Sequence, residues 1–229
     1  MANEIISYLE MCRRETASLQ RGMNFGLGGT HSVILMSLRQ NAPYADRLDN
    51  DGSTLIYEGH DESKTKELRD PKTVDQPEYT INGTPTQNGR FHQAAQAYKD
   101  GRRHPERVRV YEKIHSGIWS YNEMFHLLDS WKEKDGIRQI FKFKLVAVEG
   151  EENFAVPAST HAEHRRIIPT SNKLVVWKRD GGRCVTCGAV DELHYDHVIP
   201  FSRGGTSMSV ENVQLLCVRH NLEKRDKIL

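Results

Sequence analysis

Two pairs of metal-binding residue types lie close together near the end of this chain: Cys184-x-x-Cys187 and Cys217-x-x-His220. Thiolate and imidazole groups are preferred zinc ligands, and a two-residue gap lets both members of a pair reach one ion. Together the pairs supply three cysteines and one histidine, which is a complete tetrahedral set. The sequence therefore predicts a structural Zn²⁺ that joins the two segments.

The residues between these pairs have a different chemistry. Asp196 is followed directly by His197, and Asn212 and Asn221 follow at longer intervals. A carboxylate suits a hard divalent cation such as Mg²⁺ or Mn²⁺, and an imidazole can take a proton from water. A structural zinc ribbon without catalysis is the alternative, but it leaves the adjacent Asp196 and His197 without a role. The pattern favours metal-dependent hydrolysis supported by zinc.

Residues 174–227 resemble an HNH endonuclease domain of the zinc-stapled kind, through the segments WKRDGGRCVTCG, LHYDHVIPFSRGG, ENVQLLC and RHNLEKRD. The resemblance implies a ββα-metal unit and a DNA-cutting enzyme. It also implies that His197 is the general base, that Asp196 and Asn221 hold the catalytic ion, and that Asn212 orients the loop carrying His197. One residue departs from the family pattern: His220 stands where a second cysteine is usual, and histidine is an equally competent zinc ligand.

Two basic residues follow the last of these motif positions. Lys224 and Arg225 lie one turn beyond Asn221 on the expected final helix. Basic side chains at such a place can hold the phosphate backbone of DNA. Arg102 and Arg103 belong to a second basic run, for which a solvated surface is the alternative. We therefore expect these four residues to contact DNA.

The first two thirds of the chain contain both helix-like and strand-like sequence patterns. Residues 3–21 show helical spacing and end at Gly22, and residues 87–99 predict a second helix. Short apolar or alternating runs predict strands at residues 33–36, 54–57, 108–111, 123–128 and 140–145. Residues 59–79 predict a long loop. This part is thus expected to be an α+β domain.

The chain of 229 residues is long enough for two modest domains. Residues 149–170 lack periodicity and contain Pro157 and Pro169, which is typical of a connection. We expect a DNA-binding domain over residues 1–150, a linker over residues 151–170 and an endonuclease domain over residues 171–229.

The stretch Pro105–Leu145 resembles the second half of an SRA (SET- and RING-associated) domain, and weaker similarity extends over residues 26–148. The resemblance implies a curved β-barrel with helices that binds duplex DNA and flips a modified cytosine into a pocket. Tyr44 and Tyr57 would stack on the base, and either Asp46 or Asp49 would accept from its exocyclic amine. The segment Tyr57-Glu58-Gly59-His60 departs from the family's Tyr-Thr-Gly-Ser-Gly-Gly turn.

Composition is compatible with a cytoplasmic DNA-binding protein. The net charge is +1, and the first residues have neither a basic region nor a long apolar run. Assigning three of the four cysteines to zinc leaves no disulfide framework, as expected in a reducing compartment.

Together the two resemblances imply a modification-dependent restriction endonuclease that cuts foreign DNA carrying 5-methylcytosine or 5-hydroxymethylcytosine. Because one HNH site cuts one strand, a homodimer is the simplest route to a double-strand break. Two alternatives stay open. One is an HNH nuclease of a phage or mobile element that is indifferent to modification, and the other is a binder of modified DNA that does not cut.

Overall fold

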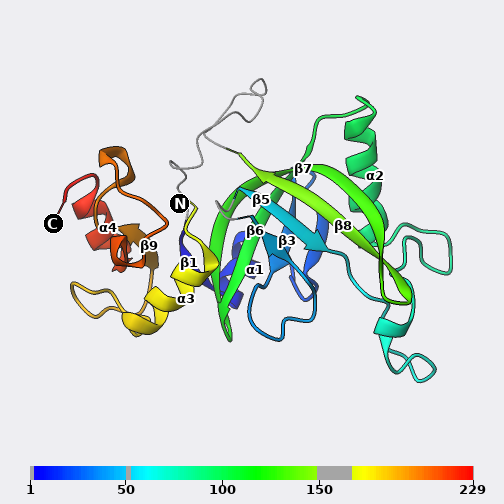
Figure 1. Cartoon of the computed structure of the whole chain (residues 1–229), viewed down its shortest axis with the longest axis horizontal. Coiled ribbons are helices and arrows are strands. Elements are labelled where there is room, and N and C mark those ends of the chain that lie inside the picture. Colours follow the sequence, from blue (N-terminus) through cyan, green and yellow to red (C-terminus); the bar gives the residue numbers. More distant parts are fainter. Residues whose placement is uncertain (1–2, 50–52, 149–166, 229) are drawn as a thin grey trace.

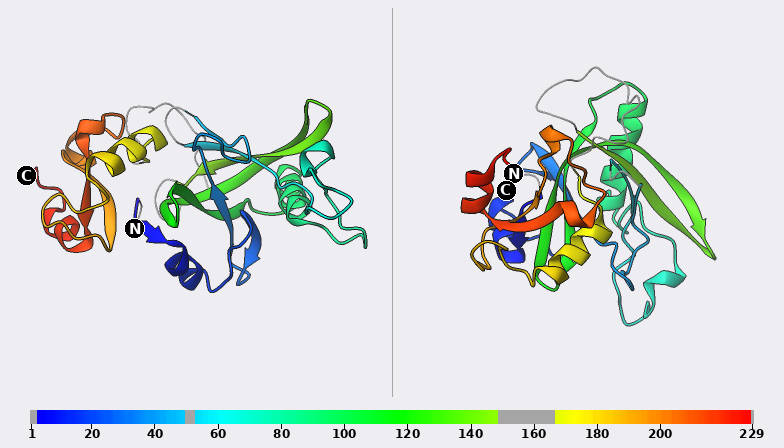
Figure 2. Two further views of the ribbon diagram at one scale, coloured as in Figure 1. Left: turned by 90° about the horizontal axis from the view of Figure 1, so that it is seen from below. Right: turned by 60° about the vertical axis from the view of Figure 1, so that its left-hand side comes forward.

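The computed structural model describes residues 3–49, 53–148 and 167–228, and these form two parts (Figure 1). One part is a strongly curved sheet with helix α2 beside it, and the other is a small unit that contains α3, β9 and α4. The segment at the N-terminus lies between the two parts, as the views in Figure 2 also show. The whole is an α+β fold.

The larger part is built on an eight-stranded sheet. Seven strands follow the order β2-β3-β6-β7-β8-β5-β4, and β1 is the eighth, paired with β7. All five strands expected from the sequence are confirmed within it. The bounds are β1 Ile5–Ser7, β2 Met23–Leu27, β3 His31–Met36, β4 Arg47–Leu48, β5 Thr54–Glu58, β6 Glu106–His115, β7 Ile118–Asp135 and β8 Arg138–Ala147.

The middle of this sheet is buried on both faces. β3 and β6 pair in parallel, with Ile34 opposite Val110, and the flanking pairs are antiparallel. Ile34 and Val110 belong to one hydrophobic cluster, whereas Val33 and Tyr111 belong to another on the opposite face. This double burial explains why β3 is a continuous apolar run and does not alternate.

The helix expected at residues 87–99 is confirmed as α2, Gln87–Lys99. Thr86 begins it, because its side chain accepts a hydrogen bond from the Gly89 N–H. Phe91, Ala94 and Ala95 are its buried apolar residues and pack into the cluster that contains Phe143. α2 therefore covers one face of the sheet.

The helix expected over residues 3–21 is wrong in extent. Residues 5–7 form β1, and only α1, Tyr8–Arg14, is helical. Ser7 caps the helix in a reciprocal arrangement with Glu10, which fixes its start, and Thr16 has a left-handed φ of 48° just beyond its end. The apolar residues whose spacing suggested one long helix are divided between β1 and α1.

The smaller part has the ββα order expected from the sequence. α3 spans Thr170–Arg179, β9 spans Leu193–His197, β10 spans Val213–Cys217 and α4 spans Val218–Lys224. β9 and β10 are antiparallel, so that Gln214 faces Asp196 and Val213 faces His197. Short 3-10 turns occur at Pro71–Thr73, Phe201–Arg203 and Val210–Asn212.

Most of the expected linker, residues 151–170, lies outside the described residues. Its last residue, Thr170, already begins α3, and Ile168 just before it is buried in the core of the smaller part. The domain limits at residues 150 and 171 stay a prediction. Within the described part of the chain, no helix is long and apolar enough to cross a membrane.

Candidate functional site

The four expected zinc ligands come together in the structure. One ligand atom from each of Cys184, Cys187, Cys217 and His220 lies within 4.8 Å of all the others. Nδ1 of His220 is 3.5 Å from Sγ of Cys184 and 3.3 Å from Sγ of Cys217. Separations of this size suit ligands that share one tetrahedral ion, and three sulfurs with one imidazole nitrogen are a zinc donor set.

Backbone N–H groups favour the ionised form of one of these cysteines. Burial raises the pKa of the Cys184 thiol, but hydrogen bonds from the backbone N–H groups of Cys217, Cys187 and Thr186 outweigh it and lower that pKa to about 6. A thiol of this kind is largely thiolate at neutral pH, and the thiolate is the form that binds metal. The residues present therefore fit a structural zinc ion.

Cys184→Ser should remove about one zinc per chain and unfold the C-terminal unit, because zinc binding contributes to the folding free energy of such small units. Metal analysis and thermal unfolding of the purified protein measure both effects. Cys12→Ser is the matched control, since Cys12 lies on α1 and outside the cluster. A Cys184→Ser protein that keeps its zinc and its stability would contradict the assignment.

Asp196 and His197 are the last two residues of β9, and β10 holds them in place. Nε2 of Gln214, directly across the strand pair, donates to Oδ2 of Asp196 at 3.2 Å. Nε2 of His197 lies 2.8 Å from Oγ of Ser207, which fixes the orientation of the imidazole. Both side chains are partly exposed at the end of the strand, where a substrate can reach them.

Asn212 fastens the loop that follows His197. Its Oδ1 accepts from the Ile199 N–H at 2.8 Å, and its Nδ2 donates to the carbonyls of Ile199 and Thr206. Gly205 is required in the same loop, because a β-carbon there would lie 1.8 Å from the Ile199 carbonyl oxygen. The side chain of Asn212 is thus fully engaged with the backbone of this loop, and its part in catalysis stays a prediction.

Lys224 is not a surface residue, and its expected contact with the DNA backbone needs correction. It is only 1% exposed, and its ammonium lies 3.0 Å from Oδ2 of Asp196. The same ammonium donates to the carbonyl oxygen of His197 at 2.6 Å. Lys224 is buried because α4 turns this face toward β9, and it holds both members of the Asp196-His197 pair.

The residues also fit a divalent ion beside Asp196. The contacts that described residues make with this carboxylate go to Oδ2, which leaves Oδ1 as the oxygen for a cation. Asn221 precedes Lys224 by one helical turn and therefore shares its face of α4. Carboxylate and carboxamide oxygens are ligands that Mg²⁺ and Mn²⁺ accept.

Lys224→Met should destabilise the C-terminal unit, because it leaves Asp196 without its buried partner. We expect a loss of about 3 kcal/mol, which is the low end of the range for such a change, since Asp196 keeps some contact with water. Urea unfolding measures this free energy. Lys227→Met is the control, since Lys227 is exposed just beyond the helix. Equal stability of the two variants would show that the pair contributes little.

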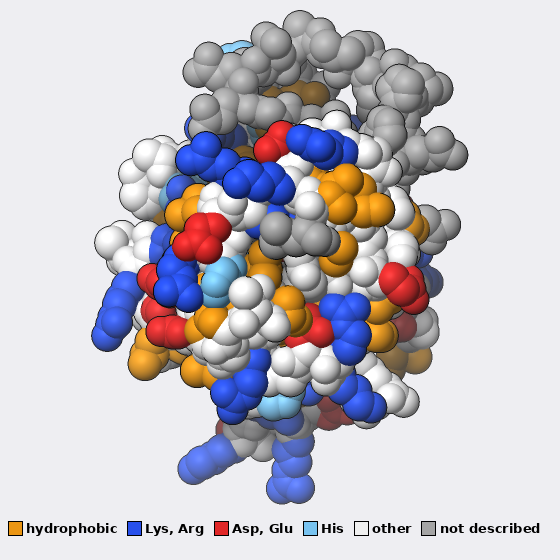
Figure 3. All heavy atoms as spheres, turned by 90° about the vertical axis from the view of Figure 1, so that its left-hand side faces the viewer, with side chains coloured by type: hydrophobic (Ala, Val, Ile, Leu, Met, Phe, Trp, Pro, Cys, Tyr) orange, Lys and Arg blue, Asp and Glu red, His pale blue; other side chains and the backbone are white. Residues whose placement is uncertain are grey.

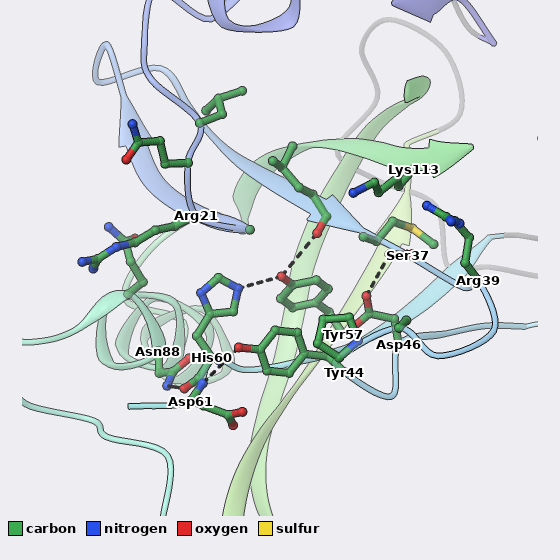
Figure 4. Close-up of a pocket in the computed structure, with 18 of the residues that line it drawn as sticks. Arg21, Ser37, Arg39, Tyr44, Asp46, Tyr57, His60, Asp61, Asn88 and Lys113 are labelled. Atoms are coloured by element: carbon green, nitrogen blue, oxygen red, sulfur yellow. Dashed lines mark hydrogen bonds between the residues drawn. The ribbon is translucent and has the colours of Figure 1, made fainter. Parts of the chain in front are cut away.

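A large cavity of about 1110 Å³ opens in the N-terminal part (Figure 4). It lies between the loop after β3, the segment that follows β5 and the start of α2. Tyr44, Asp46 and Tyr57 line it, as expected, but Asp49 is outside the lining. The carboxylate of Asp49 instead accepts from the Thr54 N–H and the Ser53 hydroxyl in the turn before β5.

Of the two carboxylates expected from the sequence, Asp46 is thus the one that lines the cavity, which Asp61 and Glu62 also line. Its two oxygens accept hydrogen bonds from the N–H groups of Ser37 and Glu58. Burial raises the pKa of Asp46 to about 6, although these N–H groups and Lys142 oppose the shift. The carboxylate is thus mostly ionised at neutral pH and is held rigidly at the cavity wall.

A histidine that the sequence analysis did not single out lies against both tyrosines. The ring of His60 is stacked with that of Tyr44, at 5.3 Å between centroids and 14° between planes. Its Nε2 is 3.0 Å from the hydroxyl of Tyr57, which is itself only 1% exposed. Burial lowers the pKa of His60 to about 4, so the ring is neutral at physiological pH.

The wall of the cavity is fixed by buried polar groups from distant segments. Asn88 of α2 accepts from the His60 N–H and donates to the His60 carbonyl. Glu58 accepts from the Ala45 N–H and pairs with Lys142 at 3.0 Å, which anchors the loop that carries Tyr44. Gly59 fits only as glycine, since a β-carbon there would lie 2.6 Å from Oε1 of Gln76.

The other predicted backbone contacts lie at the surface. Arg102 and Arg103 follow α2 and pair with Asp100 and Glu106, and they line a separate hollow beside that helix. Arg225 is exposed at the end of α4. Basic side chains are spread over the face that the C-terminal unit presents, with acidic ones between them (Figure 3).

Residues 184–227 match the HNH endonuclease family. The matched segment holds the four zinc ligands, the Asp196-His197 pair and both asparagines. No curated protein matches the chain.

Three solved structures illustrate the similarity of the larger part. The SRA domain of SUVH5 with hemimethylated CG DNA is 21% identical with a TM-score of 0.44, over 66% of this chain and 90% of that one. The same domain bound to fully hydroxymethylated CG DNA is 18% identical with a TM-score of 0.43, over the same shares. Arabidopsis thaliana SUVH6 with SAM is 17% identical with a TM-score of 0.43, over 86% of this chain and 31% of that one.

Residues 184–227 thus match the HNH endonuclease family, and the chain is similar to solved structures of SRA domains.

Proposed function

We propose that this protein is a modification-dependent DNA endonuclease, which reads a modified cytosine in its N-terminal cavity and hydrolyses a phosphodiester bond at Asp196 and His197. One observation carries the nuclease half: within a segment that matches HNH endonucleases, a buried lysine and a loop-fastening asparagine hold an aspartate–histidine pair. The reading half rests on the SRA-like sequence and on a cavity that combines Tyr44 with Asp46.

In the proposed reaction His197 takes a proton from the attacking water, since it is the imidazole at the exposed end of β9. Lys224 and Ser207 hold its backbone and ring in position. Asp196 and Asn221 would hold a Mg²⁺-like ion, which when bound neutralises charge on the phosphate and the leaving 3′-oxygen. Arg225 is placed to contact the DNA backbone beside this site.

In the proposed reading step the base leaves the duplex and enters the cavity, where aromatic faces recover part of the lost stacking. The ionised Asp46 accepts from the exocyclic amine of cytosine. His60 occupies the neighbourhood of Tyr44, so the base either stacks beside its ring or displaces it. Arg102 and Arg103 lie outside this cavity and could add phosphate contacts only along a longer stretch of DNA.

The biological role that we propose is restriction of modified foreign DNA in the cytoplasm by a homodimer. Two sites are needed for a double-strand break, because one Asp196-His197 pair cuts one strand. Sedimentation of the protein with and without DNA measures the oligomeric state.

The direct test is digestion of matched plasmids that carry cytosine, 5-methylcytosine or 5-hydroxymethylcytosine, with Mg²⁺ or Mn²⁺ present. We expect cutting of the modified plasmids, and His197→Ala should abolish it while zinc content and DNA binding remain. His115→Ala is the control, since His115 is exposed at the end of β6 in the other part of the molecule. Equal cutting of all plasmids would favour an HNH nuclease that is indifferent to modification.

The reading step is tested by binding, with His197→Ala as a full-length background that does not cut. Tyr44→Ala should reduce the preference for modified DNA by about ten- to a hundredfold, the value of one stacking face, with a smaller loss of total affinity. Tyr79→Ala is the control, because Tyr79 is exposed and does not line the cavity. Unchanged preference in Tyr44→Ala would remove this residue from the pocket.

A further inference from the structure

One short segment hydrogen-bonds to both sheets of the molecule. The Asn3 N–H donates to the Tyr121 carbonyl on β7 at 3.0 Å, and the Asn3 carbonyl accepts from the Tyr195 N–H on β9 at the same distance. Glu4 adds a bridge to His194, also on β9. The segment therefore connects β7 of the reading domain directly to the strand that ends in Asp196 and His197 (Figure 2).

The next two residues continue this connection with apolar side chains. Ile5 and Ile6 alternate along β1, so they point to opposite faces of the strand. Ile5 packs against the hydrophobic core of the C-terminal unit, and Ile6 is buried in the core around Met11 and Trp119. β1 thus contributes to both cores, while Asn3 and Glu4 just before it pair with β9.

A buried ion pair makes a second connection. Lys173 of α3 is 0% exposed, and its ammonium lies 3.1 Å from Oε2 of Glu112 on β6 and 2.6 Å from Oδ1 of Asn122 on β7. Nδ2 of Asn122 donates to the same oxygen of Glu112 at 2.8 Å. On the other side, the Tyr195 hydroxyl donates to the Lys173 carbonyl at 3.0 Å. Lys173 therefore links β6 and β7 to β9.

Such a junction resists sliding. If α3 shifted across the sheet, Lys173 and Glu112 would lose their partners while still buried, and an unpaired buried charge is strongly unfavourable. Three independent contacts connect the larger and the smaller part of the molecule: the backbone pairing of Asn3 and Glu4, the apolar side chains of β1, and the ion pair of Lys173. The cavity and the Asp196-His197 pair are therefore held at one distance and one orientation.

We infer that Lys173 is a positioning residue that makes the enzyme cut at a single set distance from the modified base. The inference rests on the proposed function. Successive phosphates of one DNA strand are spaced about 3.4 Å along the helix axis, and a misplacement of about 1 Å at a reacting centre can cost about a hundredfold in rate. A rigid junction therefore selects one phosphate, whereas a flexible one would accept several.

The first test uses the wild-type protein and a duplex with one modified cytosine, labelled on each strand in turn. Mapping of the cuts at nucleotide resolution should give one dominant phosphate per strand, cut at least about tenfold more than its neighbours. Modification-dependent cutting that is spread evenly over several phosphates overturns the inference alone. Cutting that ignores the modified base overturns the proposed function, and the inference with it.

The second test asks whether Lys173 sets the position. In Lys173→Ala the dominant phosphate should lose its tenfold advantage, with cuts spread to neighbouring phosphates, while zinc content and binding to the modified duplex remain. A residue with only a structural role would lower total cutting and leave its position unchanged. Lys178→Ala is the control, because Lys178 is exposed on the same helix and should keep the sharp pattern.

Asn122→Ala provides a milder variant in case Lys173→Ala does not fold. It removes the 2.6 Å partner of the ammonium and one donor to Glu112, but it leaves the Lys173–Glu112 ion pair in place. It should broaden the cuts in the same way, to a smaller extent. The role of Lys173 is overturned if a folded Lys173→Ala protein cuts as sharply as the wild type. If Lys173→Ala does not fold, the same result with Asn122→Ala overturns it.

Discussion

The convergence of four ligands within 4.8 Å is the constraint on which the C-terminal unit depends. Cys184 and Cys187 follow α3, and Cys217 and His220 lie at the junction of β10 with α4. A unit shorter than about 70 residues rarely obtains enough free energy from its core alone, and a metal is one of the usual supplements. Because β9 lies between the two ligand pairs in sequence and beside β10 in space, the same closure fixes the strand that carries Asp196 and His197.

A buried lysine pairs with a carboxylate at both candidate sites, and in each it fixes the position of neighbouring groups. Lys224 neutralises Asp196 and grips the His197 carbonyl, and Lys142 pairs with Glu58 behind the cavity. Each lysine fixes the position of the backbone and carboxylate that it contacts, because a buried ammonium group must keep its partners. Removing one partner of such a pair is costly, whereas replacing both partners by apolar residues need not be, so the pairs serve mainly to fix one arrangement of the side chains around them.

The sequence was most informative where ligand spacing and periodicity act locally. The zinc ligands, the ββα order, α2 and the five strands all follow from patterns within a few residues of each other. The helix expected at residues 3–21 was wrong in extent because β1 pairs with β7 and Glu4 just before it pairs with His194 of β9, both far away in the chain. The positions of Lys224, His60 and Lys173 depend on tertiary contacts. The sequence therefore predicted Lys224 as a surface contact to DNA and did not single out His60 or Lys173. The spacing of Asn221 and Lys224 by three residues did carry a usable signal, since it places both on one helical face.

The parallel pairing of β3 with β6 has a consequence for how the protein folds. Ile34 lies beside Val110, so the centre of the sheet closes only after the long intervening segment has been brought into place. Closing such a segment has an entropic cost, and folds dominated by distant pairings fold slowly. The cavity residues from Tyr44 to Asn88 all belong to that segment. The cavity should therefore be among the last features of the larger part to form, after the strands on either side of that segment have been brought together.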